Sequence, residues 1–143
     1  MGLDASVYRN LKNLPAHMRE RVTVDPESGE TDFRDFADYE IFGLSKLKAW
    51  HERIGNIAMV AFIREEVAKA FGNQESLLSK KVVYSGSHAG DHIPFSQIAD
   101  LTREIDELEN RTSTSRPPEL TNFIAQMRNL IAAANREGNG IVF

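Results

Sequence analysis

The chain has 143 residues, a formal net charge of −4 and no cysteine. Its length fits one domain, and its 41% hydrophobic and 27% charged residues are typical of a globular protein rather than a disordered or membrane-spanning one. The absence of cysteine excludes disulfides, cysteine-ligated zinc, iron–sulfur clusters and thiol nucleophiles, and the acidic balance argues against general nucleic-acid binding.

No segment has the pattern of a signal peptide or a membrane span. The first residues, Met1–Leu14, contain Asp4, Arg9 and Lys12 and lack a continuous apolar region. The longest mostly apolar stretch, Ile57–Ile63, is far shorter than the roughly 20 residues that cross a bilayer. We therefore expect no membrane association and a cytoplasmic location.

The first third of the chain predicts short strands. Apolar and polar residues alternate loosely over Gly2–Arg9, which indicates a half-buried strand, and Asn10–Pro15 has the composition of a loop. Arg21–Asp25 is rich in β-branched residues. The turn residues Pro26–Gly29 follow it, so Glu30–Phe33 is expected to return as the second strand of a hairpin.

A helical region is predicted next. Apolar residues at three- and four-residue steps place one stripe on a helix face: Leu44, Leu47, Trp50 and Ile54. The pattern breaks near Gly55 and resumes over Ile57–Phe71, which predicts two helices or one kinked helix. Trp50 lies on the stripe and is expected in the core. Ile57–Ile63 is apolar almost all round and is expected to be the most buried element.

The last part alternates between strand and helix patterns. Leu77–Tyr84 predicts a strand, residues 85–92 form a polar loop, and a helix is expected to open at Pro94. Residues 112–118 form an internal linker, and Ile141–Phe143 predicts a short terminal strand. Two helical stripes are expected to face the core: Ile98, Leu101, Ile105 and Leu108, and Leu120, Phe123, Ile124, Met127, Leu130, Ile131 and Ala134.

These elements predict a single α+β domain over residues 1–143. We expect an antiparallel or mixed sheet of about four or five short strands packed against three or four helices.

The loop at residues 85–92 holds the densest set of functional side chains. His88, Asp91 and His92 lie within five positions, and imidazole and carboxylate groups both bind divalent metals. The sequence therefore allows a metal site made of these three residues. The alternative is an ordered loop in which Asp91 accepts backbone N–H bonds and caps the turn toward the Pro94 helix.

The same loop also fits an anion or phosphate cradle. Small residues between a strand and a helix can turn backbone N–H groups toward a ligand. The candidate ligand-binding residues of this loop are Ser85, Gly86, Ser87, His88, Gly90, Asp91 and His92. Both the Walker A ending and the dinucleotide fingerprint are missing, so the sequence names no particular ligand.

Four segments resemble small uncharacterised proteins of bacteria and their phages. These segments are the opening Met-Gly-Leu-Asp, Arg53–Ala58, the loop Tyr84–Asp91 and the closing Gly138–Phe143. The resemblance implies an accessory role, such as phage counter-defence, toxin immunity or signal sequestration. It carries no activity, cofactor or residue role with it.

Three functions from different classes remain at this point. The leading hypothesis is a small binding protein, without catalysis or cofactor, that holds a protein partner or a small ligand with the loop at residues 85–92. The second is a hydrolase in which His88, Asp91 and His92 hold a divalent metal, which lowers the pKa of bound water. The third is a structural accessory protein that assembles, for instance as a homodimer.

Overall fold

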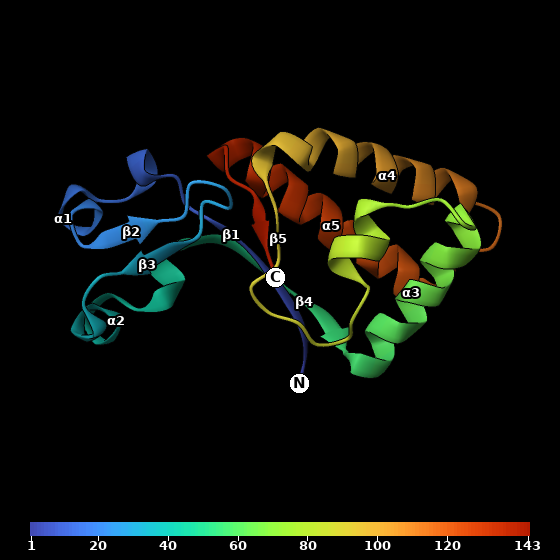
Figure 1. Ribbon diagram of the computed structural model, residues 1–143, viewed down its shortest axis with the longest axis horizontal. Coiled ribbons are helices and arrows are strands. Elements are labelled where there is room, and N and C mark those ends of the chain that lie inside the picture. The colour runs from blue at the N-terminus through green and yellow to red at the C-terminus, as the bar shows by residue number, and fades with distance from the viewer.

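The protein is built around one antiparallel sheet of four strands in the order β4-β1-β6-β5. In the computed structural model, which describes all 143 residues (Figure 1), α3 and α5 pack against this sheet and α4 packs on both helices. The strands are β1 (Gly2–Tyr8), β4 (Lys48–Asn56), β5 (His92–Ile93) and β6 (Ile141–Val142). The long helices are α3 (Ile57–Phe71), α4 (Ile98–Arg111) and α5 (Pro118–Glu137). The predicted α+β class is confirmed.

Strand β1 lies at the centre of the sheet and joins the two ends of the chain. It pairs with β4 on one side and, through Ser6 and Val142, with β6 on the other. Leu3, Ala5 and Val7 are buried on its helix-facing side, while Asp4 is exposed. The alternation of the opening residues therefore predicted this strand correctly.

The main core is a cluster of 26 buried residues between the sheet and the three long helices. The two predicted stripes on α4 and α5 are buried throughout and supply much of it. The expectation that Ile57–Ile63 would be the most buried element is wrong. Ile57 is 47% exposed, and only Val60 and Ile63 of this segment are buried. The helix α3 stands at one end of the sheet, so one of its sides faces solvent (Figure 1).

Residues 9–47 form a small lobe inserted between β1 and β4. A separate cluster of seven buried apolar residues holds it together. The predicted hairpin is present as β2 (Val22–Val24) and β3 (Thr31–Phe33), flanked by α1 (Ala16–Arg19) and α2 (Phe36–Phe42). The lobe lies at one end of the paired strands β1 and β4, and α3 lies at the other (Figure 1).

The predicted helix from Leu44 to Ile54 is wrong, because most of this segment is strand β4. Its apolar residues do not share a face. Leu47 is buried in the small lobe and Ile54 in the main core, whereas Trp50 is 41% exposed. The edge of β1 offers a long row of backbone hydrogen-bond partners. Pairing with β1 outweighs the weak helical spacing of the apolar residues, so this segment forms a strand.

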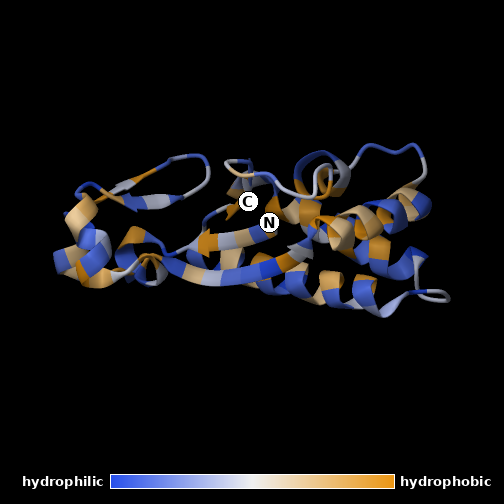
Figure 2. Cartoon of the chain, turned by 90° about the horizontal axis from the view of Figure 1, so that it is seen from below, coloured by the Kyte–Doolittle hydropathy of each residue, from blue (hydrophilic) through white to orange (hydrophobic).

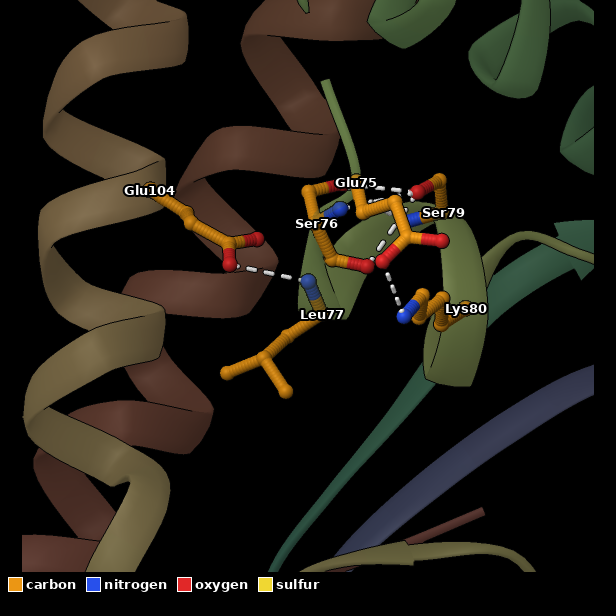
Figure 3. A network of polar contacts seen from close by, with 6 residues as sticks. All are labelled: Glu75, Ser76, Leu77, Ser79, Lys80 and Glu104. Atoms are coloured by element: carbon orange, nitrogen blue, oxygen red, sulfur yellow. Dashed lines mark hydrogen bonds and ion pairs between the residues drawn. The ribbon is translucent and has the colours of Figure 1, made fainter. Parts of the chain in front are cut away.

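The predicted strand at Leu77–Tyr84 is also wrong. Residues Leu78–Val82 form a helical turn, which we call the 78–82 turn. Figure 3 shows the carboxylate of Glu104 on α4 beside the start of this turn. It accepts hydrogen bonds from the backbone N–H groups of Leu77 (2.8 Å) and Leu78 (3.1 Å). A side chain distant in sequence therefore satisfies the donors that a helix start leaves free.

Two other features complete the fold. The predicted linker, residues 112–118, lies where α4 ends and α5 begins. No helix of the structure has both the length and the apolar character that crossing a membrane requires.

The role of Glu104 can be tested by stability measurements. We expect Glu104→Ala to lower the free energy of unfolding by about 2 kcal/mol, since it leaves two partly buried N–H groups without partners. Urea unfolding measures this change. The matched control is Glu107→Ala, which removes an exposed ion pair with Arg111 on the same helix and should cost less than about 1 kcal/mol. Equal losses in the two variants would contradict the capping role.

Candidate functional site

The predicted loop is present and leads from the 78–82 turn into β5. It brings together three side chains, those of Tyr84, His88 and Asp91. The Nδ1 atom of His88 lies 2.8 Å from the carboxylate of Asp91, and the Tyr84 hydroxyl donates a hydrogen bond to the same carboxylate oxygen. The rings of Tyr84 and His88 stack with their centroids 4.5 Å apart.

Most contacts of this loop are internal. The His88 side chain is only 6% exposed, and its Nε2 donates to the carbonyl of Val82 at 2.9 Å, since a carbonyl can only accept. The backbone also ties the loop to the C-terminal residue. Gly90 N–H donates to the carbonyl of Phe143, and Phe143 N–H donates to the carbonyl of Asp91. The backbone of Gly90 and Asp91 therefore holds the loop against the C-terminal residue, and the ring of His88 lies beside that of Phe143.

The titration of this network follows from its hydrogen bonds. The hydroxyl bond from Tyr84, helped by the nearby His88 imidazole, lowers the pKa of Asp91 below its usual value. The same bond raises the pKa of Tyr84, because its proton is held by a carboxylate. The network is thus most stable with Asp91 ionised and Tyr84 neutral.

The structure does not bring the three predicted metal ligands together. His92 turns away from His88 and pairs with Glu27 of the hairpin turn, with 3.3 Å between Nε2 and the carboxylate. His92 begins strand β5, in which successive side chains point to opposite faces. No group of three or more His, Asp or Glu side chains in the structure is arranged to hold a metal ion.

The predicted cradle residues have other roles in the fold. A Cβ atom on Gly86 would come within 2.9 Å of Ile57, so glycine lets the loop pass close to the start of α3. Gly90 has a φ of 87°, and its N–H is already bonded to the C-terminal residue. Ser85 accepts a long bond, 3.4 Å, from the N–H of Ser87. A pocket of about 500 Å³ does lie beside Ser87 and His88.

A second site lies at the free edge of β4, and the sequence did not predict it. We call it the edge groove; it has a volume of about 460 Å³ and is lined by Leu44, Ser45, Lys48, Ala49, Trp50 and His51. Trp50 and Leu44 are each 41% exposed. The indole N–H of Trp50 donates to Glu52 at 3.0 Å, and Asn129 of α5 donates to the same carboxylate at 3.1 Å. The indole is therefore held in place beside the groove.

The residues of β4 have different characters on its two faces. Trp50 and Glu52 lie opposite the helix-facing residues Val7 and Ala5 of β1. On the other face, Lys48, His51 and Arg53 stand in a row opposite Tyr8, Ser6 and Asp4. Figure 2 shows β4 as a largely hydrophilic strand beside the more apolar β1. One face of this edge thus carries Lys48, His51 and Arg53, with Arg53 paired to Asp4 of β1 at 3.0 Å, and the other face is anchored by Trp50.

His51 also forms a cross-strand pair with Ser6. The serine hydroxyl lies 2.9 Å from Nδ1 of His51, and Asp4 lies 3.8 Å from Nε2, beyond hydrogen-bond distance. Ser6 is only 5% exposed. These residue types occur in hydrolytic triads, but this set lacks the second hydrogen bond of a triad, and we assign it to sheet pairing.

One local signal could have identified β4. The side chain of Asn56 accepts a hydrogen bond from the N–H of Met59 at 2.8 Å, which is an N-cap. Because the N-cap at Asn56 starts a helix at Ile57, residues 44–54 cannot belong to that helix and must form a separate element. Nothing local predicts which of its side chains face solvent, because that depends on β1.

Comparisons with known proteins add no relatives. No family model, no curated protein and no solved structure matches this chain. The functional interpretation therefore rests on the geometry of the loop and of the edge groove.

The Asp91 network predicts a stability change at low pH. Because the pKa of Asp91 is lower in the folded protein than in the unfolded chain, its ionised form stabilises the fold at and above about pH 4. This stabilisation is lost as the pH falls through the folded pKa. We expect the wild type to be more stable than Asp91→Asn at pH 6 and the difference to shrink between about pH 4 and 2. Thermal unfolding across this range measures it, and a difference independent of pH would contradict the assignment.

Proposed function

We propose that this chain is a protein-binding protein without catalytic activity, which adds an extended segment of a partner to the free edge of β4. The partner segment alternates acidic and large apolar residues. The observation that carries the proposal is the position of Trp50, which lies exposed at the sheet edge rather than in the core. The loop at residues 85–92 then has a supporting role, because the backbone of Gly90 and Asp91 holds the C-terminal residue Phe143.

The free edge supports binding through the backbone. β4 has a strand partner on one side alone, which leaves backbone N–H and C=O groups for an added strand, although the carbonyl of Arg53 already accepts a hydrogen bond from Gln126 of α5 at 2.7 Å. Its pairing with β1 is regular from Trp50 to Arg53 and irregular on both sides of this stretch. The regular stretch fits a short partner segment, whose backbone bonds supply affinity.

Trp50 supports recognition of an apolar side chain. Tryptophan is enriched among residues that dominate binding energies, since it offers a large contact area with few rotatable bonds. The hydrogen bond to Glu52 already fixes its orientation, so little side-chain entropy is lost on binding. Leu44 completes the apolar part of the edge groove.

The charged residues of β4 support the acidic positions of the proposed partner segment. Lys48, His51 and Arg53 line one face of the edge, and no carboxylate lines the groove. In an added strand, every second side chain lies on this face. Arg53 already pairs with Asp4 at 3.0 Å, so an acidic residue of the partner would pair with Lys48, while apolar residues at the alternate positions would contact Trp50.

Trp50 is the one tryptophan of the chain, so its fluorescence reports directly on the groove. We expect a peptide that alternates valine and aspartate to shift the emission to the blue and to protect β4 amides from hydrogen exchange. A peptide that alternates valine and lysine should do neither. Labelled-peptide anisotropy should show that Trp50→Ala and Lys48→Glu each weaken binding about tenfold or more.

The matched control is Phe36→Ala, which removes another exposed aromatic side chain outside the groove and should leave the affinity unchanged. Equal affinity for the two peptides, or binding that persists in Trp50→Ala, would overturn the proposal. Sedimentation of the free protein tests whether a second copy of the chain occupies the edge instead. A dimer that disappears in Trp50→Ala would assign this edge to a second copy of the chain instead.

A further inference from the structure

We propose a second binding site, for the phosphate group of a small phosphate monoester, where the end of α3 meets the turn between α4 and α5. The site is independent of the edge groove. We call it the turn pocket; it has a volume of about 680 Å³ and is lined by Phe62, Glu66, Lys69, Ala70, Arg111, Thr112, Thr114, Ser115, Arg116 and Pro117. Figure 1 shows this turn at the end of the helical layer farthest from the small lobe.

Three cations from separate parts of the fold meet in the turn pocket. Lys69 comes from α3, Arg111 is the last residue of α4, and Arg116 lies in the turn. Glu66 pairs with Lys69 and Glu107 with Arg111, so Arg116 leaves the pocket with one uncompensated positive charge in a chain whose net charge is −4. An uncompensated positive charge in a concave site favours an anion.

The two arginines are held in fixed positions with donors to spare. Arg116 donates from Nε to the hydroxyl of Thr112 at 3.1 Å and from a terminal nitrogen to the carbonyl of Glu109. No carboxylate pairs with it, so its charge is uncompensated. Arg111 donates to the carbonyl of Ala70 at 2.9 Å and pairs with Glu107. Each guanidinium has five N–H donors, and those left over can bind phosphate oxygens.

The remaining walls suit a phosphate ester rather than a simple halide. Thr114 and Ser115 are exposed at the rim and offer hydroxyl donors, whereas Phe62 and Pro117 provide apolar surface. Lys69 is already paired with Glu66 at 2.9 Å, so an anion must compete for this cation. A phosphate with nearly two charges competes better than a monovalent ion.

The test is a titration of the full chain followed by amide NMR. We expect sodium phosphate to shift the amides of residues 111–117 saturably, whereas sodium chloride at equal ionic strength does not. We expect Arg116→Gln to weaken phosphate binding about tenfold and Lys69→Gln about threefold. The matched control is Lys80→Gln, an exposed lysine paired with Glu75 elsewhere, and it should have no effect.

A comparison of ligands separates the free ion from an ester. Adenosine 5′-monophosphate should bind more tightly than inorganic phosphate, and Phe62→Ala should remove that advantage. Equal affinities would identify inorganic phosphate as the ligand and overturn the ester. Shifts that chloride reproduces, or a phosphate affinity that Lys69→Gln leaves unchanged, would overturn the site itself. Lys69 is exposed, so its variant remains informative even where Arg116→Gln fails to fold.

Discussion

The pairing of β1 with β4 is the contact on which the rest of the structure depends. It joins the first residues of the chain to Lys48–Asn56 across the inserted lobe and makes β1 the middle of the sheet. The C-terminal strand β6 then pairs with the other side of β1, which brings both termini to one place. Such long-range pairing costs loop-closure entropy, and burial of the 26-residue core offsets that cost.

The elements that were predicted correctly from the sequence are those whose structure follows largely from their own pattern of apolar and polar residues. The apolar stripes of α4 and α5 are long and regular, and both helices lie where the stripes indicated. The segments at 44–54 and 77–84 were assigned wrongly because their structures depend on distant partners. One segment is a strand because β1 lies beside it, and the other is helical where the carboxylate of Glu104 caps it.

The candidate sites show the same division between local and distant information. Composition was enough to predict a polar loop at residues 85–92, since glycine and serine disfavour regular structure there. The direction of His88 depends on Phe143 and Val82, which the local pattern does not contain. Trp50 was placed in the core for a related reason, because its exposure follows from β4 being the last strand of the sheet.

The free edge of β4 also has to avoid pairing with unrelated strands. An open edge is a template for aggregation unless charges or irregular pairing limit it. Here Lys48, His51 and Arg53 occupy one face, and shifts in register lie on both sides of the regular stretch at residues 50–53. These features disfavour long neutral strands, because such strands would desolvate Lys48 without a counter-charge. They do not disfavour a short acidic segment, which neutralises Lys48, so the same lysine both protects the edge and selects its partner.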